Sequence, residues 1–276
     1  MAILFGGRSA EHEISLLSAR FVLESLDPER FEPVLVGIDK AGRWLLQDAP
    51  RLLAQARDPR AVSLDATQAP VLLPPHPAGG LVTTTGERAP LAIDVAFPVL
   101  HGPLGEDGTV QGLLELAGVP FVGSGVLGSA VGMDKDVMKR LLVAANLPVL
   151  PYRTLRRARF ERDRNAELEA LAGLGLPLFV KPANLGSSVG VSRVAERAAL
   201  AAAVAHAFEF DDKVVVEAGL ERPREIECAV LGGEAPFASI PGEIVVDHAD
   251  GFYSYAAKYL DENGAHTRIP AELSAT

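Results

Sequence analysis

The sequence of 276 residues is poor in several features that would otherwise dominate its interpretation. It contains one cysteine, Cys228, which excludes an intrachain disulfide and any metal site built from several cysteines. It has no run of basic residues, and 26 Lys and Arg against 36 Asp and Glu give a formal net charge of −10. A chain of this charge does not hold a phosphate backbone non-specifically, so we expect no nucleic-acid partner.

Residues 116–133 form a long charge-free stretch, but their composition is not that of a membrane span. They include Pro120 and five glycines, which predicts strand and turns. The N-terminus has neither a basic leader nor an apolar run as long as that of a signal peptide. We therefore expect a globular protein of the cytoplasm, without membrane association and about two domains in length.

The first part of the chain alternates short apolar runs with helical patterns, which predicts a mainly parallel α/β sheet. From Ser9 onward, the spacing of Ile14, Leu17 and Phe21 places these residues on one face of a helix. Residues 65–90 are rich in Pro, Gly and Thr and are expected to form a surface loop. The other elements expected here are strands at 2–5, 33–39, 93–100 and 119–122, a short segment around Trp44 and a helix at 110–117.

The last part of the chain is expected to be antiparallel, beginning with strands at 214–217 and 225–230. In the second of these, alternate residues face opposite sides of the strand. Ile226, Cys228 and Val230 therefore share one face, and Cys228 is predicted to be a core residue.

Between these parts, the alternation of helices and strands continues. The elements expected there are helices at 133–146, 165–172 and 196–208 and strands at 149–155, 177–181 and 189–194. The chain is thus expected to comprise three parts, at residues 1–122, 123–217 and 218–276.

The strongest chemical signal is a lysine, Lys181, at the end of a buried strand and directly before a loop rich in Gly and Ser. Glycines let the backbone N–H groups of such a loop approach an anion closely, and Ser187 and Ser188 add hydroxyl donors. A lysine charge beneath a mobile glycine-rich flap suits the binding of a triphosphate. An ordinary hairpin turn is the alternative interpretation.

Three further side chains are candidates for the same nucleotide site. Lys135 opens a predicted helix and would supply a second cation. Glu217 and Glu225 lie on strands expected to line the cleft, where a carboxylate accepts hydrogen bonds from ribose hydroxyls or an adenine amine. Taken singly, each of them is better explained as a solvated surface charge.

Two candidates for a small-molecule site lie in the first part of the chain. Ser9 is predicted to be the N-cap of the first helix, and Glu11 then lies in its first turn, where helix-dipole complementation alone would explain it. His101 follows a buried strand, and ligands of open α/β sheets gather at the carboxyl ends of strands.

Together with other motifs in a fixed order, these residues resemble the D-alanine–D-alanine ligase family of ATP-grasp enzymes. The resemblance runs from Leu4 to the last residues without a large gap. It implies an N-terminal α/β substrate domain at 1–122, a central ATP-grasp subdomain at 123–217 and a C-terminal antiparallel subdomain at 218–276. Its markers are the segments 5–15 (FGGRSAEHEIS), 100–102, 105–109 (GEDGT), 123–125, 133–135, 181–190, 224–227 and 252–259 (FYSYAAKY).

The resemblance implies ATP-dependent ligation of two D-alanines through an acyl phosphate, for peptidoglycan precursor synthesis, by a homodimer. It implies that Glu11 holds the ammonium group of the first D-alanine and that His101 lies beside its carboxylate. Lys258 and Tyr259 belong to a closing loop, in which Tyr259 links to Ser187 and Glu11. Ligases that make D-alanyl-D-lactate lack this tyrosine, so we expect the dipeptide. The implied ATP-binding residues are Lys135, Lys181, Ser187, Ser188, Glu217, Ala218, Leu220, Glu225 and Lys258.

The sequence departs from the family at its C-terminal end. The family's two Mg²⁺ or Mn²⁺ ions are held by an aspartate on a late strand and by a Glu-x-Asn pair, and neither occurs before Thr276. We therefore expect a truncated C-terminal subdomain with exposed apolar surface, no metal ligands in these 276 residues, and no activity from them alone. The alternatives are a non-catalytic relative that binds ATP or D-alanine, and a ligase that joins D-alanine to D-lactate.

Overall fold

The protein is described by a computed structural model that covers residues 1–55, 58, 60–77, 80–84, 90–221, 223–261 and 263–274. The chain divides into two compact units, which we call unit 1 (Met1–Val149 with Ala183–Gly186) and unit 2 (Leu150–Pro182 with Ser187–Thr276). The three-part division expected from the sequence stays a prediction. Residues 78, 79 and 85–89 of the predicted surface loop lie outside the described residues.

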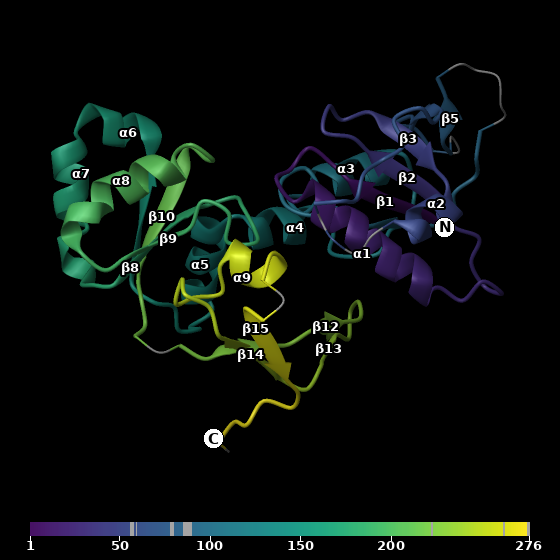
Figure 1. The fold of residues 1–276 in the computed structure, drawn as a ribbon. Helices are drawn as coiled ribbons and strands as arrows, with labels where there is room; N and C mark the ends of the chain where they lie inside the picture. The colour runs from purple at the N-terminus through teal and green to yellow at the C-terminus, as the bar shows by residue number, and fades with distance from the viewer. Residues whose placement is uncertain are drawn as a thin grey trace. The chain divides into compact units, whose positions relative to one another are not determined.

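Unit 1 is built on a six-stranded mixed sheet in the order β5-β4-β3-β2-β1-β6 (Figure 1). β1 pairs in parallel with β2 and β6, as the sequence predicts, whereas β2 to β5 follow one another antiparallel toward the far edge. The strands are β1 (Ala2–Gly6), β2 (Val34–Ile38), β3 (Trp44–Gln47), β4 (Pro70–Leu72), β5 (Val82–Thr83) and β6 (Ala96–Pro98).

Helices cover both faces of this sheet, so β1 is buried along its whole length. Leu4 packs in one cluster with Leu114 of α3, while its neighbour Phe5 packs on the opposite face with Leu16 of α1. Burial of each such side chain stabilises the folded state by about 1.5–3 kcal/mol. Because both faces of β1 are covered, its sequence is a continuous apolar run and does not alternate with polar residues. The helices of unit 1 are α1 (His12–Ser25), α2 (Ala49–Ala54), α3 (Thr109–Leu116), α4 (Val126–Met133) and α5 (Lys135–Ala144).

Two predictions about α1 are wrong: the residue at which the helix begins, and the position of Phe21 on its buried face. Glu11 rather than Ser9 is the N-cap, and Phe21 is 52% exposed instead of facing the sheet with Ile14. The buried side includes Ser15, which hydrogen-bonds the strand ends. A polar residue thus occupies the inner face because it satisfies backbone groups there, which an apolar periodicity does not reveal.

Helix α4 lies within the stretch that the sequence analysis predicts as strand and turns. Its glycines lower helix propensity by about 1 kcal/mol each relative to alanine. However, α4 packs against α3 and α5, and tertiary contacts override propensity.

Three strand predictions in unit 1 are also corrected. The strand expected at 93–100 is reduced to β6, and the one expected at 119–122 is a single bridge between Phe121 and Ala96. The predicted surface loop contributes β4 and β5 to the sheet. Short edge strands of two or three residues carry too few alternating positions to be recognised in a sequence.

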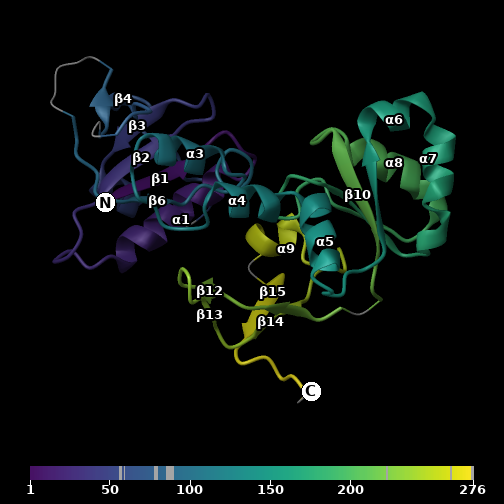
Figure 2. The same cartoon turned by 180° about the vertical axis from the view of Figure 1, so that it is seen from behind.

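The first sheet of unit 2 is antiparallel throughout, in the order β7-β10-β8-β9. Helices α6, α7 and α8 lie on one face of it (Figure 2), and a single cluster joins Phe160 of α6 and Val204 of α8 to Val180 and Val216 of the strands. These elements agree with the sequence prediction except for α6, which forms in a charged segment. They are β7 (Tyr152–Arg156), α6 (Arg157–Arg162), α7 (Arg164–Ala170), the 3₁₀ turn η1 (Ala172–Leu174), β8 (Leu178–Pro182), β9 (Ser192–Val194), α8 (Arg197–Ala207) and β10 (Lys213–Ala218).

The opposite face of this sheet carries the polar residues. Lys181 pairs with Val215 and Phe179 pairs with Glu217 across β8 and β10, so all four side chains share that face. Because Val180 and Val216 must face the helices, the alternation of the strands fixes Lys181 and Glu217 on the other side.

The last part of the chain forms a second, three-stranded antiparallel sheet, as predicted, in the order β11-β14-β15. Cys228 is exposed, so its predicted core position is wrong, and Ile226 and Val230 are 37% and 69% exposed. The strand ends at Glu227, and alternation leads to burial only where another layer covers the face. The elements are β11 (Glu225–Glu227), β12 (Val230–Leu231), β13 (Phe237–Ala238), β14 (Gly242–Val246), α9 (Tyr255–Tyr259) and β15 (Ala265–Arg268).

Over the part of the chain that the structure describes, no helix is both long enough and apolar enough to cross a bilayer.

Asp65 organises the turn that leads into β4. Its carboxylate accepts hydrogen bonds from Thr67 N (3.0 Å), Thr67 Oγ1 (2.6 Å) and Gln68 Nε2 (2.9 Å), and it pairs with Arg51 of α2. The side-chain amide of Gln47 on β3 binds the backbone of the same residue: Gln47 Nε2 donates to Asp65 O, and Asp65 N donates to Gln47 Oε1. The hydrogen bonds from Gln68 and Thr67 lower the pKa of Asp65 to about 2.

We predict that Asp65→Asn weakens the acid sensitivity of unit 1. A carboxylate with a lowered pKa stabilises the folded state above its ordinary pKa near 4, and this stabilisation is lost as the pH falls toward 2. The variant should therefore be less stable than wild type at pH 7 and should lose less stability between pH 5 and pH 2.

Urea unfolding followed by the fluorescence of Trp44, the only tryptophan of the chain, measures this difference. The exposed Asp94→Asn is the matched control and should behave as wild type. An identical pH dependence for wild type and Asp65→Asn would contradict the assignment.

Candidate functional site

The turn after β1 delivers Glu11 to a buried position. Gly6 and Gly7 have φ values of 88° and 96°, which L side chains rarely adopt, and they turn the chain into α1. Glu11 N donates to Ser9 Oγ at 3.2 Å, and the Glu11 side chain is only 2% exposed. A buried carboxylate at a helix N-terminus benefits from the positive end of the helix dipole.

The segment after β6 closes around the same carboxylate. Gly102 has a φ of 69°, and a Cβ there would lie 2.7 Å from Glu11 Oε2, so only glycine fits. Gly102 N donates to Glu106 Oε2 at 2.7 Å, and Asp107 accepts from Leu104 N at 2.8 Å. The Glu106–Asp107 motif therefore holds this turn in place.

One side of α1 is bonded to this segment through two serine hydroxyls. Ser15 Oγ accepts from Gly6 N at 2.8 Å and donates to Val99 O at 2.5 Å. One turn later, Ser18 Oγ lies 2.9 Å from His101 Nε2. The structure thus brings His101 alongside α1. Glu11 is the N-cap of the same helix.

Lys135 and the loop 183–186 form the remaining part of the candidate site in unit 1. Lys135 N donates to Ala183 O at 3.0 Å, and Lys135 Nζ donates to Leu185 O. A Cβ at Gly186 would lie 3.4 Å from Glu11 Oε2 and 4.0 Å from Glu106 Oε2. The glycine-rich loop therefore passes Glu11 at close range, within the same compact unit.

In unit 2, Lys181 and Glu217 form an ion pair on the helix-free face of the sheet. The side chain of Glu217 is 7% exposed and that of Lys181 is 25% exposed. Lys181 Nζ also lies 5.6 Å from the centre of the Phe179 ring, which Phe252 contacts edge-on. The sequence analysis assigns both charged residues to the nucleotide but does not predict that they pair.

The flap residues Ser187 and Ser188 are bonded to the segment that carries α9. Ser187 Oγ lies 2.9 Å from Tyr259 OH, and Ser188 Oγ donates to Tyr253 O at 2.8 Å. Both serines have positive φ values, 48° and 60°, which cost free energy in residues with a Cβ. Strain of this kind persists where surrounding contacts over-determine the backbone, and the two hydrogen bonds supply such contacts.

Lys258 and Tyr253 define a second contact within that segment. Lys258 Nζ lies 4.6 Å from the centre of the Tyr253 ring, a cation–π arrangement. Burial raises the pKa of the Tyr253 phenol, and the negative charges of Glu227 and Glu225 raise it further. Glu225 thus lies near enough to Tyr253 to influence it electrostatically.

The other predicted site residues are less constrained. Ala218 ends β10, and Leu220, two residues later, is 52% exposed. The predicted link between Tyr259 and Glu11 stays a prediction. Within the described ranges, no group of three or more His, Cys, Asp or Glu side chains is arranged to hold a metal ion.

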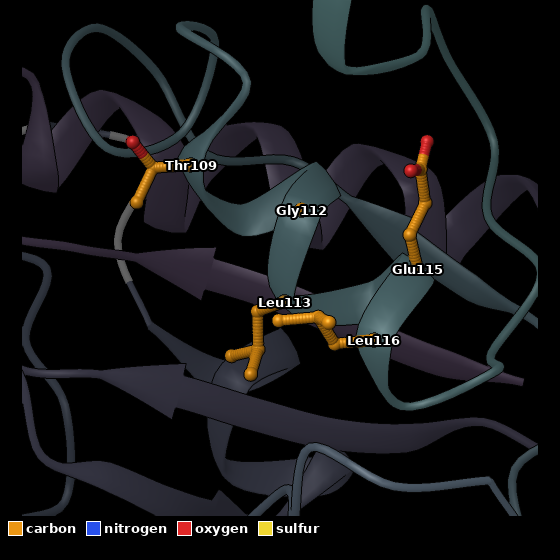
Figure 3. A pocket seen from close by; sticks show the side chains of 5 residues that line it. All are labelled: Thr109, Gly112, Leu113, Glu115 and Leu116. Atoms are coloured by element: carbon orange, nitrogen blue, oxygen red, sulfur yellow. The ribbon is translucent and has the colours of Figure 1, made fainter.

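A cavity of about 700 Å³ lies on the outer side of α3, apart from the predicted site residues (Figure 3). Leu113 and Leu116, one helical turn apart, form its apolar wall, and Thr109, Gly112 and Glu115 complete the lining.

Sequence reasoning missed Ser18, Glu106 and Tyr253 as contacts of the candidate site. Ser18 lies seven positions after Glu11, which is two helical turns, so this spacing was the available signal. Glu106 lies in the marker segment 105–109, but the sequence does not indicate which group it binds. Tyr253 binds Ser188 through its backbone carbonyl, and a sequence gives no signal for such a bond.

Two family models match the chain. One is described as the D-Ala–D-Ala ligase N-terminus and covers residues 1–124, and the other as the D-Ala–D-Ala ligase C-terminus and covers residues 141–276. Among curated proteins, D-alanine–D-alanine ligase A of Chromobacterium violaceum is 52% identical over 275 residues, which are 99% of this chain and 74% of that protein. The ligase A of Escherichia coli K12 is 50% identical over 276 residues, with the same coverage.

Solved structures give the same result and have the ATP-grasp fold that the sequence predicts. The D-Ala:D-Ser ligase VanG of Enterococcus faecalis matches with a TM-score of 0.81 and 35% identity, over 99% of this chain and 77% of that one. The D-alanine–D-alanine ligase of Coxiella burnetii matches with a TM-score of 0.74 and 37% identity, over 88% and 69% of the two chains. The chain spans about three quarters of the length of these relatives. The sequence analysis expects the 276 residues to be truncated and inactive, and none of the matches shows either.

We predict that Tyr259→Phe loosens the flap. The change removes the hydroxyl that bonds Ser187 and leaves the ring in place. Loss of one hydrogen bond should raise the amide hydrogen exchange of residues 187–190 by about 2- to 10-fold, as measured by mass spectrometry. Tyr253→Phe is the control, because Ser188 binds the backbone carbonyl of Tyr253 and not its phenol. Equal effects of the two variants would refute the role of the Tyr259 hydroxyl.

Proposed function

From the membership of this chain in the D-alanine–D-alanine ligase family, we propose that it joins two D-alanines to D-alanyl-D-alanine, at the expense of ATP, for peptidoglycan precursor synthesis. The observation that carries the proposal is the hydrogen bond between Ser187 and Tyr259, in a chain that aligns with curated ligases over 99% of its length. We propose that the enzyme acts in the cytoplasm, where ATP is available.

Glu11 and His101 are proposed to bind the first D-alanine. The buried Glu11 carboxylate would accept hydrogen bonds from the substrate ammonium group, and His101 would donate to the substrate carboxylate. The backbones of Gly102 and Gly186 approach Glu11 closely, so a side chain at either position would crowd the carboxylate that is proposed to bind the substrate.

The nucleotide is proposed to lie against Lys135, Lys181 and the flap. Lys181 would meet its phosphates, and the ion pair with Glu217 would position the ammonium group on the sheet face. The other proposed ATP-binding residues are Ser187, Ser188, Glu217, Ala218, Leu220, Glu225 and Lys258.

The residue types suit the chemistry of ligation. A carboxylate is a poor electrophile, and ATP would supply the phosphoryl group that converts it to an acyl phosphate. Lys135 and Lys181 would offset the negative charge of the anions that must approach one another. The flap and the segment with Lys258 and Tyr259 would exclude water, which otherwise hydrolyses the activated carboxylate before the second D-alanine attacks.

Mg²⁺ or Mn²⁺ would supply further counter-charge to the phosphates, and the family pattern implies two such ions. The described residues do not fit them, since no suitable cluster of ligating side chains is present in that part of the chain. No step is therefore assigned to a metal. That residues 1–276 are inactive on their own stays a prediction.

The proposal is tested with purified protein by measuring D-alanine binding calorimetrically and phosphate release from ATP with D-alanine, with L-alanine as the control. Phosphate release that depends on D-alanine supports the ligase, and the product mass with D-alanine, D-lactate or D-serine as second substrate identifies the product. Binding without turnover is the result expected if residues 1–276 are inactive on their own, and also if the protein is a non-catalytic relative. Absence of both D-alanine binding and phosphate release would refute the proposal.

Glu11→Gln should weaken D-alanine binding about 10- to 100-fold and change ATP binding little, because a charge-assisted hydrogen bond is lost.

We further propose that the protein is a homodimer formed through the outer side of α3 and α4. Leu116 and Leu127 are 64% and 77% exposed, and Leu116 also forms the apolar wall of the α3 cavity together with Leu113. Leu116→Glu with Leu127→Glu should convert a dimer to a monomer in light scattering, whereas Leu72→Glu on β4, 57% exposed in wild type, should not. A monomeric wild type would contradict this proposal.

A further inference from the structure

A polar stripe runs along the inner side of α1, where core packing would favour apolar residues. Glu11, Ser15 and Ser18 follow one another at spacings of four and three residues, so they lie on the same face of the helix. The Ser15 hydroxyl binds only backbone groups in the described structure: it accepts a hydrogen bond from Gly6 N and donates one to Val99 O. Ser18 differs, because its partner is the side chain of His101.

The direction of the hydrogen bond between Ser18 Oγ and His101 Nε2 depends on which nitrogen of His101 carries the proton. A serine hydroxyl in a helix commonly donates to the carbonyl four residues earlier, and Ser25 Oγ does so to Phe21 O at 2.8 Å. Within the described part of the chain, Ser18 forms no such bond, and its Oγ lies 2.9 Å from His101 Nε2. Its hydroxyl hydrogen is therefore available to Nε2. A neutral imidazole that accepts at Nε2 carries its proton at Nδ1.

We propose that Ser18 is a positioning residue: its hydroxyl donates to His101 Nε2 and thereby holds the ring in the Nδ1–H tautomer. This tautomer can donate a hydrogen bond to a carboxylate, whereas an unprotonated Nδ1 would present a lone pair and repel it. The inference rests on the proposed function, because the carboxylate in question is that of the first D-alanine.

The first test needs no substrate and no activity. ¹⁵N NMR of protein labelled at its histidines distinguishes protonated from unprotonated ring nitrogens, and His101→Ala assigns the signals of His101 among the six histidines. Wild type and Ser18→Thr, which keeps the hydroxyl, should show Nδ1–H. Ser18→Ala should shift the ring toward a mixture of tautomers. Ser25→Ala is the matched control on the same helix and should leave the His101 signals unchanged.

The second test measures dissociation constants for D-alanine and for ATP by calorimetry. Ser18→Ala should weaken D-alanine binding about 3- to 10-fold, the value of one neutral hydrogen bond, and leave ATP binding unchanged. Ser18→Thr should restore binding. In the His101→Ala background, Ser18→Ala should have no further effect, because the serine acts through the ring.

The outcomes separate this inference from the proposed function. If wild type fails to bind D-alanine, the proposed function fails, and the tautomer experiment still decides whether Ser18 orients His101. If wild type binds D-alanine but Ser18→Ala leaves both the tautomer and the affinity unchanged, Ser18 is not a positioning residue. Equal weakening of D-alanine and ATP binding would also overturn the inference, because it would indicate a general loss of structure.

Discussion

Burial of the Glu11 carboxylate constrains much of unit 1. A carboxylate removed from water loses several kcal/mol of hydration free energy, so its surroundings must compensate. Its position directly ahead of α1 provides the positive end of the helix dipole. The backbone then approaches within a distance that excludes a Cβ at Gly102 and leaves little room at Gly186. Two glycines far apart in the sequence are thus explained by one buried charge.

Unit 2 places its charges by a different route. The apolar face of its first sheet is fixed by three helices, and the alternation of β8 and β10 leaves Lys181 and Glu217 no other side to face. The packing of the core therefore determines on which face the ion pair lies. A change of register by one residue would bury both charges.

The sequence predicted those parts of the fold that are set by period and composition. Strands β1, β2, β8 and β10 and helices α3, α5 and α8 lie within a few residues of their predicted positions, because their apolar patterns are long and covered by neighbours. Predictions failed where tertiary contacts decide. α4 forms despite two glycines, and Cys228 is exposed because its strand ends one residue earlier.

In the candidate site, too, the sequence indicates features that depend on local pattern and does not indicate those that depend on tertiary contacts. Residues such as Glu11, His101 and Lys181 could be selected as candidates from the sequence, because they lie at helix starts and strand ends or in recognisable motifs. Their partners could not, because a hydrogen bond between Ser18 and His101 joins residues 83 positions apart, and the bond between Ser188 and Tyr253 joins residues 65 positions apart. No local pattern encodes such a pair.

Serine hydroxyls connect the elements of the candidate site in both units. Ser15 and Ser18 join α1 to the segment after β6, and Ser187 and Ser188 join the flap to the segment of α9. A short side chain loses little rotamer entropy when it is fixed, so most of the free energy of its hydrogen bond remains for ordering its partner. The hydroxyl is also both donor and acceptor, and it can adapt to an imidazole, a phenol or a carbonyl. A serine also fills less space beside the segment that it orders than a long charged side chain would.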